Sequence, residues 1–176
     1  IGPGAMSAGV ATSTGTSNVA VGRDALMNLT DGYNNVAIGY EAGAKLTTGD
    51  RNIAIGLGAM CGVVTGDNNI ALGMNAADAL TSGSCNIAIG ETAYGAATTG
   101  HYNVAIGYNS IGTGVTTGEM NIAMGVSSLA AVIGGNCNVA IGRSAGNALT
   151  TGCHNIGIGG AALGGAAVTG NHNVAI

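Results

Sequence analysis

Histidine and cysteine are the side chains best suited to chemistry in this chain, and three of them recur at a nearly fixed interval. Cys137, His154 and His172 follow one another at almost equal spacing, and Cys153 stands beside His154. Thiolate and imidazole groups bind zinc. If the interval reflects stacked strands, however, the three side chains lie in a line about 4.8 Å apart, which does not form a tetrahedron. We therefore expect turn residues here, with no bound metal and no cofactor.

The acidic residues are the next candidates for chemistry. Asp50, Asp67 and Glu119 each follow a glycine at a similar point of the sequence and could suggest calcium-binding turns. The Gly-Gly-x-Gly-x-Asp pattern of calcium β-rolls is absent. Paired carboxylates do not recur, and no Ser, His and Asp share a register. We expect solvated charges and no enzymatic activity.

Cysteine and tyrosine residues are scattered along the chain. The even number of cysteines, with Cys61 and Cys85 preceding the two named above, invites a disulfide interpretation. The cysteines do not recur at one position of a regular pattern, as repeated disulfide bridges would require, so we predict free thiols. Aromatic side chains at exposed turns make good contacts to carbohydrate or protein. Four of the five tyrosines are therefore candidate surface contacts: Tyr33, Tyr40, Tyr102 and Tyr108.

These residues belong to an internal repeat. The motif Asn-[Val/Ile]-[Ala/Gly]-[aliphatic]-Gly recurs at a 17-residue interval, and two of the intervals are longer by a single residue. Counting the asparagine as position 1, position 5 is glycine wherever it is present, position 8 is Ala or Ser, and position 15 is glycine. The extra residues fall near 112–114 and near 164–166. The ten copies begin at Asn18, Asn35, Asn52, Asn69, Asn86, Asn103, Asn121, Asn138, Asn155 and Asn173.

The repeat predicts an all-β fold. A unit of this length is too short for two packed helices, and its short β-branched stretches between glycine turns are typical of strands. Each unit then forms one coil of a parallel β-solenoid or β-roll, in which identical residues stack in columns. We expect about ten coils, making a rod on the order of 45 Å long. Residues 1–12 are expected to be an irregular start or a cloning remnant, and 13–176 a single repeat domain.

The strand sequence leaves the number of chains open. Val-Ala-Ile alternates large, small and large side chains, so Ala takes one face and the two large residues take the other. If the large residues point inward, the chain can be a self-sufficient monomer. If Ala fills a narrow interior, an apolar stripe faces outward and requires partners. We favour the second arrangement and an oligomer.

Threonine forms two neighbouring columns ahead of the position-15 glycine. A flat threonine array on a solenoid is how several ice-binding proteins order water, which gives the main alternative function. Adjacent strand residues point to opposite faces, however, so both columns cannot share one flat surface. Position 13 includes Thr30, Thr47, Thr81, Thr98, Thr116 and Thr150. Position 14, the alternative ice-binding column, includes Thr48, Thr65, Thr99, Thr117, Thr151 and Thr169.

Composition excludes several other classes. Only 7% of residues are charged and Lys and Arg number four, so no basic patch for nucleic acid is available. Polar residues and glycine interrupt every apolar stretch well before the roughly 20 residues of a membrane helix. Hydrophobic residues make up 47% of the chain, however, which is more than disordered chains carry. The chain can therefore bury a thin core of Ala, Val and Ile.

The unit at 35–51, Asn-Val-Ala-Ile-Gly-Tyr-Glu-Ala-Gly-Ala-Lys-Leu-Thr-Thr-Gly-Asp-Arg, resembles the 17-residue repeats of phage tail-fibre proteins. Its Asn-Val-Ala-Ile-Gly core also resembles the head repeats of YadA-like trimeric autotransporter adhesins, whose units are shorter. The resemblance covers roughly residues 13–176. It implies a homotrimeric β-roll on a virion tail fibre or bacterial cell surface, outside the cell, that binds a host receptor or glycan.

We accordingly predict a structural and adhesive fibre module, with an ice-binding solenoid as the alternative. The regular columns serve the coil itself. Specific recognition is expected where the columns vary, at positions 6, 7, 9, 10, 16 and 17, and at the two insertions, because an extra residue cannot join a strand ladder and must bulge outward.

Overall fold

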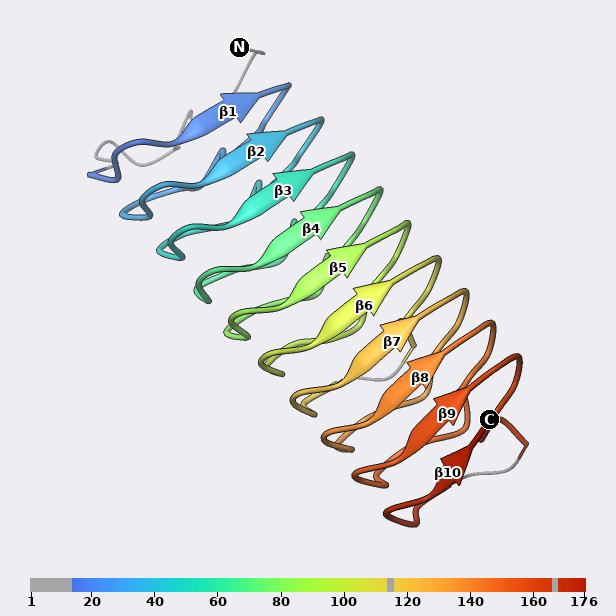
Figure 1. Cartoon of the computed structure of the whole chain (residues 1–176). Helices are drawn as coiled ribbons and strands as arrows, with labels where there is room; N and C mark the ends of the chain where they lie inside the picture. The colour runs from blue at the N-terminus through green and yellow to red at the C-terminus, as the bar shows by residue number, and fades with distance from the viewer. Residues whose placement is uncertain (1–13, 114–115, 166–167) are drawn as a thin grey trace.

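The computed structural model describes residues 14–113, 116–165 and 168–176, and these form a single stack of β coils (Figure 1). The described residues contain ten short parallel strands and no helix, which confirms the predicted all-β solenoid. The expected irregular start at 1–12 lies outside the described residues. The strands are β1 (Val19–Val21), β2 (Val36–Ile38), β3 (Ile53–Ile55), β4 (Ile70–Leu72), β5 (Ile87–Ile89), β6 (Val104–Ile106), β7 (Ile122–Met124), β8 (Val139–Ile141), β9 (Ile156–Ile158) and β10 (Val174–Ala175).

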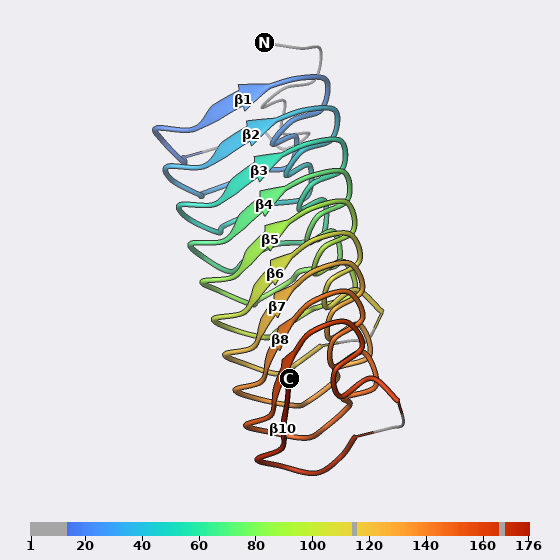
Figure 2. The same ribbon diagram turned by 45° about the vertical axis from the view of Figure 1, so that its right-hand side comes forward.

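Each strand pairs in parallel with the next one along the chain, and the coils stack along one axis (Figure 2). The register follows the repeat: Val36 pairs with Ile53, and Ala37 pairs with Ala54. Where a coil is longer by one residue the register is kept, so that Val104 pairs with Ile122. The added residue is therefore accommodated outside the strands. The segments 114–115 and 166–167, on which the predicted insertions partly fall, lie outside the described residues.

The interior of the coil is narrow and is filled from both sides. The central alanine of the strands points inward; Ala37, for example, has no exposed surface. Larger side chains at positions 9 and 12, such as Leu26 and Leu46, complete the core. Small residues at positions 3 and 8 leave room for them, so the core consists of alternating small and large side chains.

The asparagines at position 1 form a continuous hydrogen-bonded ladder inside one corner. The Oδ1 of Asn52 accepts the backbone N–H of Asn69 at 2.9 Å, and its Nδ2 donates to the carbonyl of Gly66 at 2.9 Å. The same pair of contacts recurs in successive coils, and Asn52 is 1% exposed. A buried amide that satisfies both a turn carbonyl and the next backbone N–H explains why no other residue occupies this position.

Two turns per coil require unusual backbone angles. Gly73 at position 5 has φ +137°, and a Cβ placed on it would lie 2.6 Å from the carbonyl oxygen of Gly90 in the next coil. Only glycine fits this close approach. The residue before each ladder asparagine is left-handed as well, with Arg51 at φ 55°. Such angles cost energy for residues other than glycine, and the stack of identical coils offsets that cost.

Candidate functional site

The outer face of the strands is an apolar ribbon, defined here as the side chains at positions 2 and 4 of the ten coils. Ile38 and Ile55 expose 38% and 37% of their surface, and Val19 exposes 47%. None of the described residues in these two columns is buried. The structure therefore decides between the two arrangements that the alternation allows: Ala fills the interior and the large aliphatic residues face outward.

Position 6, just after the turn glycine, widens this outer surface. Leu57 and Met74 expose 49% and 42% of their surface, and Tyr108 exposes 52%. At the first coil the guanidinium of Arg23 stacks over the ring of Tyr40 at 4.3 Å. The column is mixed in character, so it is where the outer surface differs from one coil to the next.

The two threonine columns differ in burial, as strand alternation predicts. At position 13 the hydroxyl of Thr81 donates to the carbonyl of Thr98 in the next coil at 2.9 Å, and Thr30 makes the same bond to Thr47 at 3.0 Å. These hydroxyls are used within the stack. The threonines at position 14 are all exposed. The exposed threonine array is therefore one column wide.

The four candidate tyrosines are not brought together. Tyr40 and Tyr108 share position 6 but are four coils apart, while Tyr33 and Tyr102 stand at positions 16 and 17. All four have accessible rings, with Tyr102 exposed by 61%. The four rings lie apart and do not form a single aromatic patch, and whether any of them makes a contact stays a prediction.

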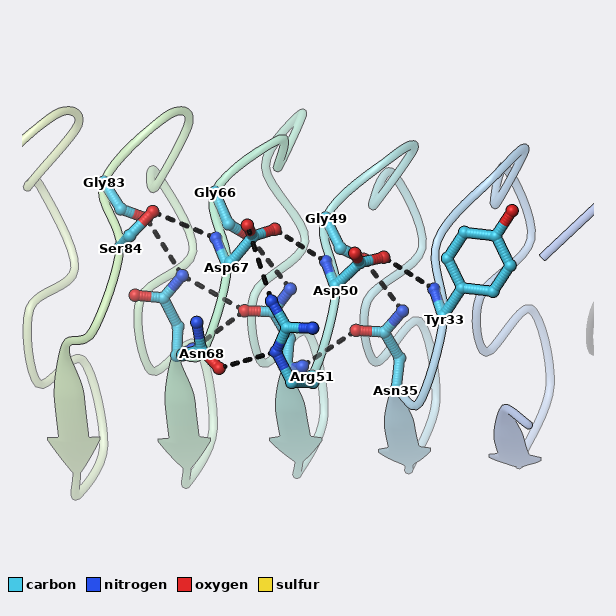
Figure 3. Close-up of polar contacts among 12 residues, drawn as sticks. Tyr33, Asn35, Gly49, Asp50, Arg51, Gly66, Asp67, Asn68, Gly83 and Ser84 are labelled. Atoms are coloured by element: carbon cyan, nitrogen blue, oxygen red, sulfur yellow. Dashed lines mark hydrogen bonds and ion pairs between the residues drawn. The ribbon is translucent and has the colours of Figure 1, made fainter. Parts of the chain in front are cut away.

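Position 16 holds a second ladder that the sequence reasoning missed. The backbone N–H of Asp50 donates to Oδ1 of Asp67, and that of Asp67 donates to Oγ of Ser84 (Figure 3). The chain of contacts continues from the N–H of Ser84 to Nδ1 of His101 at 3.1 Å. Further along it includes Asn136, Cys153 and Asn171. The sequence signal that could have revealed this ladder is chemical: the side chains differ in type, but each carries a hydrogen-bond acceptor.

The expectation that Asp50 and Asp67 are simply solvated charges is therefore incomplete. Both are half-buried, and each accepts a backbone N–H from the preceding coil, the two bonds being 2.8 Å long. Arg51 lies beside them, with Nη2 3.9 Å from Asp67 Oδ2 and Nε donating to Asn68 at 2.9 Å (Figure 3). Carboxylates committed to this ladder stabilise the corner, so position 16 is not a free recognition position.

Position 9 was also expected to carry recognition, and this prediction is wrong. Its side chains point into the core: Leu26, Met60 and Ile111 are at most 1% exposed. Tyr94 is also at this position and is fully buried, with its hydroxyl accepting a 2.8 Å hydrogen bond from Nδ2 of Asn103. Burial raises the pKa of this phenol above its usual value. The residue at position 9 varies because a large side chain in one coil can occupy the space that a small residue leaves in the next.

The cysteine and histidine column lies along one corner at position 17. The rings of His154 and His172 stack at a centroid distance of 5.1 Å and an angle of 10°. Among the described residues, no group of three or more His, Cys, Asp or Glu side chains is arranged to hold a metal ion. The four cysteines are free and half-buried, and burial raises the pKa of the Cys61 thiol.

Comparison with known proteins identifies no relative: no protein-family model, no curated protein and no solved structure matches this chain. Within the described residues there is also no helix of the length and apolarity needed to cross a membrane. The protein is thus defined by its class, a parallel β-solenoid of 17-residue coils with an apolar outer ribbon.

Proposed function

We propose that this chain is a structural and adhesive module of a fibre, in which three copies pack together through their apolar ribbons. The observation that carries the proposal is the outward orientation of Val and Ile in the strands. Position 2 and position 4 together present aliphatic side chains on every coil, as at Ile53 and Ile55. Soluble monomers rarely expose a contiguous apolar patch larger than a few hundred Å², whereas this strip runs along all ten coils.

The number of copies follows from the resemblance to trimeric fibre repeats, and the surface is compatible with it. The ribbon is regular and carries no charged residue at positions 2 and 4, so identical chains can align side by side with their coils in register. A cyclic arrangement buries the same patch of every copy and closes on itself. Burying the ribbon would also remove the only long apolar surface that the strands present.

The interior columns support a mechanical role. Each coil contacts only its neighbours, so repetition adds length and stiffness without new kinds of contact. The asparagine ladder and the position-16 ladder run along the axis and tie successive coils together. These properties suit a non-catalytic shaft or head located outside the cell, on a virion tail fibre or a bacterial surface. Its further partner would be a host-surface receptor or glycan, and not nucleic acid or a membrane.

An ice-binding function is the second candidate, because position 14 presents exposed threonines. Two observations favour the fibre. The exposed column is one residue wide, since position-13 hydroxyls such as those of Thr30 and Thr81 bond within the stack, and Asp31 and Gly134 interrupt it. An ice-binding face requires a regular array.

Thermal hysteresis separates the two functions. We expect no hysteresis at micromolar protein, together with binding of the intact protein to host cells or glycans. Thermal hysteresis that disappears in a Thr99→Tyr variant would make the fibre proposal wrong, because Thr99 is exposed at position 14 and contributes to no ribbon contact.

A further inference from the structure

One side of the stack is hollowed across three successive coils. The cavity has a volume of about 390 Å³ and opens to solvent. It lies where positions 6, 7, 10 and 11 of the coils beginning at Asn69, Asn86 and Asn103 come together. Its lining residues are Asp78, Thr92, Gly95, Ala96, Tyr108, Asn109 and Gly112. This volume falls within the range of small-molecule sites.

The cavity exists because two successive coils carry glycine at position 10. Most other coils place a side chain there, including Met27, Cys61 and Asn147, while the coil that begins at Asn155 has Gly164. A Cβ on Gly95 would lie 3.3 Å from Oδ1 of Asp78. One on Gly112 would meet the side-chain oxygen of Asn109. Both oxygens thus lie next to backbone that carries no side chain. They would be covered if Gly95 and Gly112 were replaced by the larger residues that most other coils have at position 10.

The polar groups of the cavity are mainly acceptors. Asp78 contributes a half-buried carboxylate, whose pKa is raised by burial. The hydroxyl of Thr92 donates to the carbonyl of Glu91 at 2.8 Å, which leaves its oxygen free to accept. Asn109 adds an amide. A ligand that suits this set must donate several hydrogen bonds at once, as a polyol does.

The remaining wall is aromatic. Tyr108 lines the cavity, and the residue is 52% exposed. An accessible ring beside hydrogen-bonding groups offers an apolar face to one side of a ligand and polar contacts to the other. A pyranose ring has this composition, with C–H groups on its face and hydroxyls around its edge. Asp78 and the exposed Glu91 next to Thr92 disfavour an anionic ligand by like-charge repulsion.

We infer that the hollow formed by Gly95 and Gly112 is a binding site for a neutral saccharide, with one sugar ring stacked on Tyr108 and its hydroxyls bonded to Asp78, Thr92 and Asn109. The inference rests on the proposed adhesive function and names the ligand class and the place of contact. In a homotrimer the site occurs three times, so weak individual binding would be strengthened by avidity on a glycan-bearing surface.

The test is saturation-transfer NMR on the intact protein with the methyl glycosides of glucose, galactose, mannose and N-acetylglucosamine as probes. The methyl glycoside of N-acetylneuraminic acid serves as the anionic comparison. We expect saturation of at least one neutral glycoside, strongest at its ring C–H protons. Tyr108→Ala should remove at least nine-tenths of the signal, and Gly95→Met should do the same by filling the cavity with a side chain that position 10 accepts at Met27.

Tyr40→Ala is the matched control, because Tyr40 occupies the same position 6 in a coil that does not line the cavity. Its signal should equal that of the unaltered protein. The inference is overturned by absence of saturation for all four neutral probes, by preference for the anionic probe, or by loss of signal in Tyr40→Ala equal to that in Tyr108→Ala. Continued binding to host cells by the Tyr108→Ala and Gly95→Met variants would overturn this site while leaving the fibre function intact.

Discussion

The strand wall, at positions 2–4, and the threonine wall, at positions 13 and 14, are built on the same stacking interval but present different outer surfaces. In the coil that begins at Asn86, the strand wall turns Ile87 and Ile89 outward, and the threonine wall turns Thr99 outward. Their inner sides are alike, since Ala88 in the strand wall and Ala97, just before the threonine wall, are both buried. Both walls also bond backbone to backbone between coils, as between Ile87 and Asn103 and between Thr81 and Thr98.

The inward and outward residues of the two walls serve different purposes. The inward residues and the turns set the stack, and apart from position 9 they vary little from coil to coil. The outward residues do not contribute to the interior, so their chemical character depends on what each wall contacts. An apolar exterior on one wall and a hydroxyl exterior on the other are what the proposal requires, with the first wall packed against protein and the second facing solvent.

The largest effect is expected from placing a charge on the strand wall. Ile87→Asp should leave the coil folded, because the side chain points away from the interior, but it should dissociate the oligomer. Burying an unpaired carboxylate at each interface costs several kcal/mol, so the dissociation constant should rise at least about a thousandfold. Sedimentation velocity measures the change. Thr99→Asp, on the threonine wall of the same coil, should keep the mass of the unaltered protein; equal dissociation by both variants would remove the distinction between the walls.

The next effect concerns the asparagine ladder that joins the two walls. Asn86→Leu leaves the carbonyl of Gly100 and the N–H of Asn103 buried without these partners. Each unsatisfied group costs about 1–3 kcal/mol, so the free energy of unfolding should fall by about 4 kcal/mol. Chemical denaturation at one fixed protein concentration measures it. Asn28→Ala, a half-exposed asparagine outside the ladder, should change it by less than about 0.5 kcal/mol. A comparable loss in both variants would contradict the ladder's role.

A smaller effect is expected at the turn that leaves the strand wall. Gly73→Ala introduces a Cβ 2.6 Å from the carbonyl oxygen of Gly90 at φ +137°, and should cost about 2 kcal/mol or more. Gly134→Ala, on the threonine wall, meets no atom within 4 Å and should be neutral or slightly stabilising. Thermal unfolding of the two variants side by side provides the measurement, and unchanged stability of Gly73→Ala would show that the turn can relax.

The smallest effect concerns the buried phenol in the core between the walls. Tyr94→Phe removes the hydrogen bond from Asn103 and should lower stability by about 1 kcal/mol at neutral pH, whereas Tyr102→Phe on the surface should have no effect. Burial raises the pKa of Tyr94 in the folded state above its unfolded value of about 10. Its contribution to stability is therefore complete below that pH and is lost as pH rises further. Above that pH the free energy of unfolding should fall less steeply with pH in Tyr94→Phe than in the unaltered protein. Equal pH dependence in the two proteins would contradict the assignment.

Much of the fold could be predicted because the repeat itself encodes the register. A fixed interval between identical residues places Val36 beside Ile53 once the chain is stacked. An alternating triplet is symmetric with respect to inside and outside, so it leaves the face taken by alanine open; the arrangement that we favoured, with alanine inside, is the one found. Position 9 was misjudged because core volume is exchanged between coils: a Cβ on Gly43 would lie 2.9 Å from Cδ2 of Leu26.

The candidate sites were harder to predict. The position-16 ladder escaped notice because Asp67, Ser84 and His101 share an acceptor and not a residue type. The saccharide cavity depends on three coils together, with glycines in two of them exposing side chains from their neighbours. This combination of residues can be recognised only in the three-dimensional structure. Tyr108 was a named candidate from sequence; Asp78 and Gly95 belong to position 10, where recognition was expected, but neither was singled out.

The central claim is that the strand wall is an interface between copies of this chain. Sedimentation equilibrium over a wide range of dilution tests it directly. The account predicts a species of three times the 16.7 kDa mass of one chain, which persists well below micromolar concentration. A species of 16.7 kDa at every concentration, folded and soluble with its apolar ribbon exposed, would contradict it.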